Sequence, residues 1–415
     1  MSVELNYDDK LKQKALEALD KKAMYGKDID LSLFEEPDET ESIDELLKLP
    51  QEIQEAAVAS GIDPTEANRS GSFMQLNHTV IYKNIQKTYD NQLEIMDIND
   101  AIAKYPEVRE KYWWQAVPVD QDKYTAFSEL QPAHGYFIRV FKGQKVDKPV
   151  QSCLMLQENA RFQNVHNIII LEDGAEAQVI TGCSLTPNVK KGLHLGISEF
   201  FIGKEAKLTF TMIHNWAQEF HVRPRSAAVV DDNGVFINNY VLLKPVHSIQ
   251  SFPTATLIGE KSTASFNSIL YGLSNSDIDI GSRIILEGKD SSGHAVSRAI
   301  VKDNAKIYAR GALESIQDNS KAHLDCRGIL MSPNGMMYAV PELISWAPGS
   351  YLSHEAAIGP IAEEEVEYLM SRGLNKDEAI SLITRGFMDV KILGLPKMLE
   401  DYISEMIVAT QKESM

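Results

Sequence analysis

The sequence predicts a mainly β protein whose core is a β-solenoid, a stack of short strands wound into coils. Between residues 150 and 352, short runs rich in β-branched and aromatic residues recur, among them NIIIL, KLTFTMI, VFINNYVLL and KIYARGAL. Small polar turns separate these runs, and no helical pattern lies between them. The turns also recur at a nearly constant spacing, which favours stacked coils over a two-sheet sandwich.

The spacing is read from the polar residue at each turn. Successive turn positions are Asp173, Glu205, Asn233, Lys261, Lys289, Asn304 and Asn319. The three intervals from Glu205 to Lys289 are equal, the interval before them is slightly longer, and the two after them are about half as long. Because each coil covers the edge of its neighbour, the last coil is expected to be capped or to pair with another chain.

The regions before the solenoid are predicted to be helical and then mixed. In residues 1–70, Leu11, Ala15, Ala18 and Leu19 recur at helical spacing, Ser42-Ile43-Asp44-Glu45 matches a capping box, and a short helix runs from Pro50 to Gly61. Residues 71–150 form a mixed connecting region, with strands at HTVIYKNIQ and GYFIRVFKG and a helix from Ile98 to Pro106. The solenoid core is assigned to residues 151–360.

Residues 361–415 return to helical patterns. A first helix starts at Glu363 and ends at Gly373, with Val366, Leu369 and Met370 as its buried stripe. A second begins at Asn375 with Glu378 and ends at Gly386, and a third is expected from Lys397 to about Thr410. This amphipathic cluster is either a cap on the solenoid or a docking surface for a partner.

Composition restricts the class of protein. The formal net charge of −18 over 415 residues argues against a nucleic-acid partner. Three cysteines, an odd number, fit a reducing compartment in which thiols persist. The N-terminus lacks the apolar core of a signal peptide, and no apolar run is long enough to span a membrane. We therefore expect a cytoplasmic protein that does not enter membranes.

The stretch from Asp318 to Ile361 carries the sharpest functional signal. It holds Cys326 close to His323 and Asp325, and the pair His354-Glu355 follows further downstream. Thiolate, imidazole and carboxylate are the side chains that bind borderline and soft transition metals. On spacing alone, however, a lone cysteine is more often a small buried hydrophobe than a ligand. Both interpretations stay open at this point.

Several motifs in order resemble one known family. They are DINDAIAKYPEVREKY, HGYFIRVFKGQKVDKPVQ, ITGCSLTP, TFTMIHNW, AHLDCRGILM, SHEAAIGPI and EEEVEYLMSRGLNKDEAISLITRGF, and they span roughly residues 97 to 387. The series resembles the SUF-type iron–sulfur cluster assembly scaffolds, SufB and its paralogue SufD, and specifically a compact, SufB-like, archaeal-type member. The resemblance implies a right-handed parallel β-helix, a dimer through that β-helix, and an iron–sulfur cluster, 4Fe-4S or 2Fe-2S, at the dimer interface.

The resemblance also implies roles for individual residues. Cys326 matches the family's cluster cysteine and His323 the histidine of the same segment, while His354 and Glu355 match the HEA motif beneath the cluster. Cys183, in GCSLTP, matches a cysteine associated with sulfur entry. Ser353 stands where a glutamate is common, which removes one expected oxygen ligand. The N-terminal CxxCxxxC of many SufB members is absent.

The resemblance further implies partners. These are a SufC-type ABC ATPase, a second copy of the chain or a paralogous subunit, a sulfur donor and recipient apo-proteins. The apolar stripes of the C-terminal helices, with Met370, Leu382, Ile383 and Phe387, are the predicted ATPase-docking surface. The chain has no GxxxxGK[S/T] phosphate loop, so we expect a scaffold that is not itself an enzyme.

Two alternatives of other classes remain. A β-solenoid can be a polysaccharide lyase or hydrolase, although the acidic residues here fall mostly in turns and helices and do not cluster on one face. It can also be a structural, SufD-like subunit in which Cys326 is buried and inert.

Overall fold

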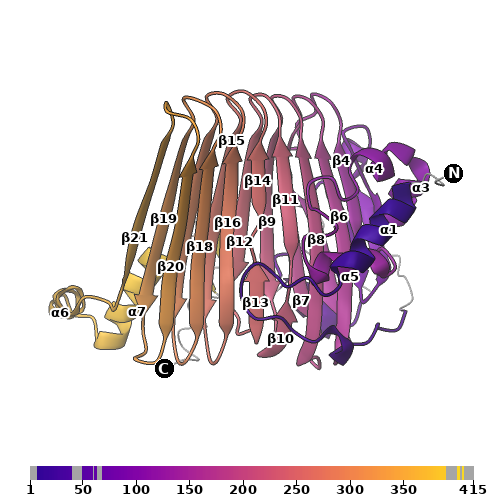
Figure 1. Cartoon of the computed structure of the whole chain (residues 1–415). Coiled ribbons are helices and arrows are strands. Elements are labelled where there is room, and N and C mark those ends of the chain that lie inside the picture. The colour runs from indigo at the N-terminus through magenta and orange to yellow at the C-terminus, as the bar shows by residue number, and fades with distance from the viewer. Residues whose placement is uncertain are drawn as a thin grey trace.

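The computed structural model describes residues 7–39, 49–58, 60–62, 68–388, 400, 401, 404 and 405. Its centre is a β-solenoid, as predicted, in which two sheets of mostly parallel strands lie face to face (Figure 1). One sheet has the order β2-β1-β5-β7-β9-β12-β15-β17-β19-β21. The other runs from β3 through β4, β6 and β8, and through two short branches, β10-β13 and β11-β14, to β16, β18 and β20.

The strand bounds follow the chain order. The first sheet contains β1 (Gly71–Leu76), β2 (Thr79–Ile85), β5 (Val150–Leu156), β7 (Glu176–Leu185), β9 (Lys207–Asn215), β12 (Val235–Leu242), β15 (Thr263–Gly272), β17 (Ser292–Val301), β19 (Lys321–Leu330) and β21 (Tyr351–Gly359). The second contains β3 (Leu93–Asp97), β4 (Tyr136–Val140), β6 (Arg161–Leu171), β8 (Lys191–Ile202), β10 (Glu219–Val222), β11 (Arg225–Val230), β13 (Ser248–Ser251), β14 (Thr254–Leu257), β16 (Asp277–Leu286), β18 (Lys306–Ser315) and β20 (Met336–Ser345).

The coil period is regular, and the turn residues explain why. In the first sheet, strand pairing links Lys207, Val235, Thr263, Ser292, Lys321 and Tyr351 in succession, so these coils are nearly equal in length. Glu205, Asn233, Lys261, Asp290 and Asn319 all have positive φ and form one column of turns. Ser274 and Asp303 share that conformation in the other column. The short intervals between the last turn positions in the sequence are therefore half-coils.

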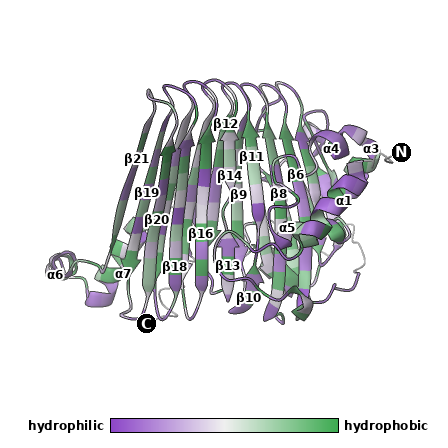
Figure 2. Ribbon diagram, in the orientation of Figure 1, coloured by the Kyte–Doolittle hydropathy of each residue, from purple (hydrophilic) through white to green (hydrophobic). Residues whose placement is uncertain are grey.

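Side chains that point into the solenoid form its main core. They include Phe200, Phe210, Phe236 and Phe266, whose rings contact one another from strand to strand. Figure 2 shows the matching alternation of hydrophobic and hydrophilic residues along the strands. No helix in the described part of the chain is long and apolar enough to cross a membrane.

Helices of the N-terminal half cover the outer faces of the first coils. They are α1 (Tyr7–Ala18), α2 (Gln51–Val58), α3 (Ile98–Lys104), α4 (Pro106–Lys111) and α5 (Lys123–Leu130), with short 3₁₀ turns η1 (Leu31–Leu33) and η3 (Lys87–Tyr89). The predicted stripe of α1 buries Leu11, Ala15 and Ala18 in a cluster with Ile168 and Ile170 of β6. Helix α2 covers the other sheet and buries Cys153. The predicted capping box at Ser42–Glu45 lies outside the described residues.

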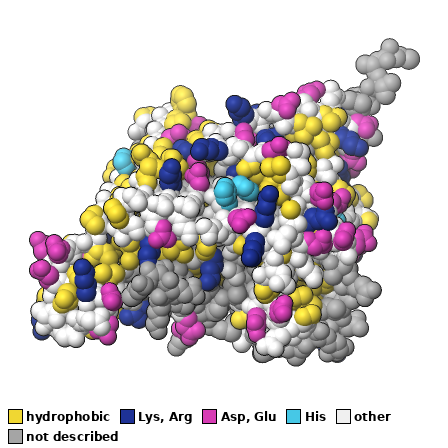
Figure 3. Space-filling model, turned by 90° about the horizontal axis from the view of Figure 1, so that it is seen from below, with side chains coloured by type: hydrophobic (Ala, Val, Ile, Leu, Met, Phe, Trp, Pro, Cys, Tyr) yellow, Lys and Arg dark blue, Asp and Glu magenta, His cyan; other side chains and the backbone are white. Residues whose placement is uncertain are grey.

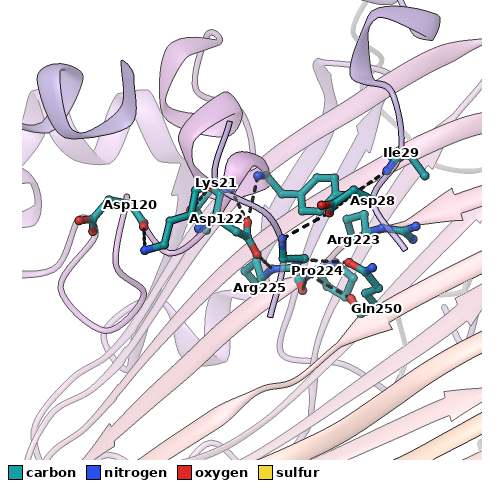
Figure 4. Close-up of polar contacts among 12 residues, drawn as sticks. Lys21, Asp28, Ile29, Asp120, Asp122, Arg223, Pro224, Arg225 and Gln250 are labelled. Carbon is teal, nitrogen blue, oxygen red and sulfur yellow. Dashed lines mark hydrogen bonds and ion pairs between the residues drawn. The ribbon is translucent and has the colours of Figure 1, made fainter. Parts of the chain in front are cut away.

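Polar contacts fix the segment between α1 and η1 onto the second sheet (Figure 4). The Lys27 carbonyl accepts hydrogen bonds from Gln250 and Arg223, and the Asp28 carboxylate accepts one from the Tyr124 hydroxyl. Beneath them, Arg225 Nε lies 2.7 Å from Asp122 Oδ2, and both side chains are buried. Residues far apart in the sequence are thereby held at one place on the sheet.

Two C-terminal helices are described, α6 (Glu363–Ser371) and α7 (Lys376–Phe387). The predicted start of α7 is confirmed, because Asn375 and Glu378 form a capping box. The predicted stripe of α6 is only partly buried: Val366 is buried, but Met370 is 44% exposed. Phe387 and Met388 pack against a row of outward-facing residues on the first sheet, which includes Ile300 and Ile329. Most of the third predicted helix, Lys397 to Thr410, lies outside the described residues.

Candidate functional site at the end of the solenoid

The solenoid ends in two uncovered strands, β20 and β21 (Figure 1, left). The described part of the chain provides no further strand beyond either of them. Large apolar side chains on or beside these strands are exposed, namely Tyr338, Leu343, Ile344, Trp346, Tyr351 and Ile358. An open sheet edge with apolar residues is suited to association with another chain. The last coil is expected to be capped or to pair with another chain; the described helices do not extend either sheet, and pairing with another chain stays a prediction.

Cys326 lies on β19, one strand from this end. Its Cα neighbours are Ser297 on β17 and Ala356 on β21. Its side chain packs against the main core and lines the internal cavity, so it faces the inside of the solenoid. Burial, with a smaller contribution from Asp325, raises the pKa of the Cys326 thiol to about 11. Metal binding at this position must therefore displace a proton.

His323 and Glu355 lie on the opposite, outer face of the same two strands. The ring nitrogen Nδ1 of His323 is 2.8 Å from the Ser353 hydroxyl, and the His323 ring stacks on His294. Arg327 bonds both Asp325, at 3.0 Å, and Glu355, at 3.4 Å. The carboxylate expected to bind metal is thus engaged by an arginine.

His354 follows the inward alternation of its strand. It pairs with Leu324, an inward-facing core residue, and it is exposed because β21 is the last strand. Neighbouring residues of a strand point to opposite faces, so His354 and Glu355 cannot approach Cys326 from the same side. Among the described residues, the four predicted ligands do not form a group whose ligand atoms all lie within 4.8 Å of one another.

Cys183 lies far from this end, on β7, and is fully buried. Its sulfur is 3.6 Å from Met212 Sδ, and burial raises the pKa of its thiol well above the usual value. His194 and His214 lie close to it, and their ligand atoms and the Cys183 sulfur are all within 4.8 Å of one another. Sequence reasoning missed both histidines. The coil period was the available signal, since it places His214 directly beside Cys183.

One internal cavity connects the two regions. It is lined by His194, His214 and Met212 near Cys183, by polar residues such as Asn238 and Asn267 in the middle, and by Leu324 and Cys326 near the end. Its volume is about 70 Å³, enough for several waters. Cys153 is not among the lining residues because it faces outward under α2.

Two family models match most of the chain. The model of the SUF system FeS cluster assembly SufBD core domain matches residues 154–387, and that of the SufBD protein N-terminal region matches residues 67–152. The chain belongs to the SufBD family. The core match includes both lumen-facing cysteines, the terminal strands and helices α6 and α7.

Curated SufBD proteins resemble this chain over nearly its whole length. An iron-sulfur cluster assembly SufBD family protein of Methanothermobacter thermautotrophicus is 46% identical over 390 residues, which cover 92% of this chain and 94% of the relative. One of Archaeoglobus fulgidus is 44% identical over 353 residues, covering 85% and 94%. One of Pyrococcus horikoshii is 31% identical over 362 residues, covering 87% and 80%.

The SufBD match also covers the four predicted docking residues, which differ in exposure. Met370 on α6 and Leu382 on α7 are 44% and 43% exposed. Ile383 and Phe387 are half-buried, and Phe387 packs against the solenoid. Figure 3 shows hydrophobic and acidic side chains together at this end of the molecule, on the left. The structure thus divides the predicted surface into outward-facing and inward-packing residues.

Proposed function

We propose that this SufBD protein is a SufB-like scaffold on which iron–sulfur clusters are assembled and from which they pass to recipient apo-proteins. The observation that carries the proposal is the place of Cys326, a thiol that lines the cavity one strand from an uncovered sheet edge. Two copies related by a two-fold axis would bring two such thiols to one interface. Thiolates are the ligands that iron–sulfur clusters require.

The remaining ligands in this proposal come from His354, Glu355 and His323. His354 shares the inward side of the strands with Cys326, and it is the candidate ligand of the same chain. Glu355 and His323 lie on the outer face, so they can act where that face meets the mate. A few thiolates combined with nitrogen and oxygen donors suit a scaffold that has to release a 2Fe-2S or 4Fe-4S cluster.

The proposal assigns sulfur handling to Cys183 and energy supply to a separate protein. Cys183 and Cys326 both face the inside of the solenoid, and the cavity reaches from His214 and Met212, which lie beside Cys183, to Cys326. A sulfur donor would deliver to Cys183. The chain carries no phosphate loop, so ATP hydrolysis falls to a SufC-type ATPase docked on α6 and α7.

Two observations favour a SufD-like structural subunit as the second candidate. Cys326 is partly buried with a raised pKa, and Glu355 is paired with Arg327. In that case the chain would act beside a paralogous subunit that supplies the cluster ligands.

Anaerobic reconstitution with iron and sulfide separates the two candidates. A scaffold should turn brown and gain visible absorption that is lost in air, and Cys326→Ser should remove it while the protein elutes as the same oligomer. Cys153→Ser is the matched control, because Cys153 is buried away from the cavity. If Cys326→Ser binds iron and sulfide as well as the parent protein, the cluster site lies elsewhere.

A further inference from the structure

A thiol and two imidazoles meet across the lumen of the early coils. Cys183 on β7 and His214 on β9 are paired in register, and His194 comes from β8 of the opposite sheet. The three side chains are 0%, 2% and 1% exposed, and their ligand atoms all lie within 4.8 Å of one another. They come from strands with regular pairing, so the protein backbone holds them in place without a ligand.

Each histidine is oriented through its Nδ1 atom. His194 Nδ1 lies 2.9 Å from the Gln163 amide oxygen, which can only accept, so that nitrogen carries the proton and Nε2 has a free lone pair. His214 Nδ1 lies 2.7 Å from the Tyr240 hydroxyl. A hydrogen-bonded second nitrogen of this kind is the usual feature of a metal-binding histidine.

The second ring nitrogen of His214, Nε2, is evidence that the site binds a ligand. Its Nε2 is buried and has no hydrogen-bond partner among the described residues. Leaving such a group unpaired in a protein interior costs free energy, so an unpaired buried nitrogen calls for an occupant. In the tautomer in which Nδ1 donates to the Tyr240 hydroxyl oxygen, Nε2 has a lone pair for a metal ion.

Met212 offers a further donor atom beside the Cys183 sulfur. Met212 Sδ is 3.6 Å from Cys183 Sγ and offers a soft neutral donor. In a tetrahedral site with bonds of about 2.0–2.3 Å, ligand atoms lie about 3.3–3.8 Å apart. Small side-chain rotations therefore close the arrangement, and the cavity gives an ion access from the lumen.

We propose that Cys183, His194 and His214 bind one divalent first-row transition-metal ion of the Fe²⁺ or Zn²⁺ class, with Met212 or water in the fourth position. On binding, the Cys183 thiol releases its proton to solvent and a sulfur–metal bond forms, with no change of oxidation state. This site is separate from the cluster site proposed at Cys326. A bound ion occupies the Cys183 sulfur, so metal binding and sulfur handling exclude each other at any one moment.

A second histidine group shows what distinguishes this one. Glu36, His78 and His134 also have ligand atoms within 4.8 Å of one another. There, however, the Asn164 N–H donates to His78 Nε2, which forces the proton onto Nδ1, and Nδ1 faces Glu36 at 3.6 Å. The nitrogen that would bind metal already carries a proton. In the Cys183 group, the Tyr240 hydroxyl can accept a hydrogen bond from His214 Nδ1, so the His214 proton can lie on Nδ1 and leave Nε2 free for a metal ion.

Cobalt binding to the metal-free, full-length protein tests the proposal. Under anaerobic conditions, Co²⁺ should bind one ion per chain with a thiolate-to-cobalt charge-transfer band and the visible bands of a tetrahedral site. Cys183→Ser should lose the charge-transfer band, and His214→Gln should lose the tetrahedral bands. Cys153→Ser should keep the full spectrum, because Cys153 is buried under α2, away from the cavity.

A milder variant tests the same site with less risk of unfolding the protein. Tyr240→Phe removes only the hydroxyl that orients His214, and it should weaken Co²⁺ binding by about 10–100-fold without changing the band positions. Survival of the charge-transfer band in Cys183→Ser would overturn the proposal, as would its loss in Cys153→Ser. Weak Co²⁺ binding by the parent protein with no thiolate band would also overturn it.

Discussion

At the scale of single residues, burial controls the chemistry of the thiols. The pKa of Cys326 is raised from 9.0 to about 11, chiefly by desolvation. The thiolate is the reactive form, and at pH 8 its fraction falls about 100-fold, while the higher nucleophilicity of a less acidic thiolate restores about tenfold, so Cys326 should react with iodoacetamide about 10-fold more slowly than an unperturbed thiol. The rate should rise about tenfold per pH unit up to the pKa. Mass spectrometry of the alkylated protein measures it, and reaction at the rate of a free thiol would contradict the prediction.

Cys183 is predicted to act in sulfur delivery. Cys183→Ser should slow cluster formation when a cysteine desulfurase supplies the sulfur and should spare reconstitution with free sulfide, because only the first route needs an acceptor thiol. The increase in visible absorption after each treatment measures the difference. Equal losses by both routes would show that Cys183 has a structural role instead.

The buried ion pair of Asp122 and Arg225 is expected to stabilise the folded protein. Asp122→Ala removes the carboxylate that caps α5 and leaves Arg225 buried without its charge partner. We expect a loss of about 3–5 kcal/mol in the free energy of unfolding, measured by denaturant titration. Asp100→Ala, which breaks the exposed pair with Lys83, is the control and should cost less than about 1 kcal/mol. Similar losses in both variants would be evidence against a special role for burial.

The arrangement of the proposed ligand residues could be predicted from the sequence only in part. The motifs located Cys326, His354 and Glu355, but the alternation of a strand separates the adjacent pair onto two faces, which a motif does not express. His194 and His214 were missed because nothing local marks them. Their proximity to Cys183 comes from coil stacking and from the meeting of opposite sheets.

At the scale of elements, α6 and α7 carry the docking prediction. Met370 and Leu382 are exposed and apolar, whereas Phe387 covers the solenoid. The variant Met370→Glu/Leu382→Glu should therefore abolish co-purification of the ATPase and leave the circular dichroism spectrum unchanged. Leu16→Glu, at a 58% exposed leucine of α1, is the matched control. Retained ATPase in the double variant would place docking elsewhere.

The elements themselves were largely predictable because the local signals agree with the fold. Polar turn residues such as Asn233 and Asn319 adopt positive φ, which asparagine tolerates better than most residues. The same signal could not separate full coils from half-coils. Two turn columns share one composition, and only strand pairing distinguishes them.

At the scale of the whole molecule, the uncovered end predicts a dimer. Ile344 on β20 and Ile358 on β21 are exposed at that end, and a charge at either would be desolvated in an interface. Ile344→Lys/Ile358→Lys should convert a dimer to a monomer in light scattering coupled to size-exclusion chromatography. Leu33→Lys, an exposed leucine far from that end in the sequence, should not. An unchanged mass in the first variant would exclude this edge as the interface.

The regular stacking of the coils also sets the distance between Cys183 and Cys326. Cys183 and Cys326 lie on strands five steps apart in one sheet, and at about 4.8 Å per step they are separated by about 24 Å. No cysteine side chain spans that gap, so in the proposed function the two thiols of one chain cannot exchange sulfur by direct contact. An insertion that shifts a strand by one position turns its side chains to the other face, so the addition or removal of whole coils is the change that alters this distance and keeps both thiols facing inward. The distance between the Cys183 and Cys326 thiols along the stack is therefore set by the number of coils between them.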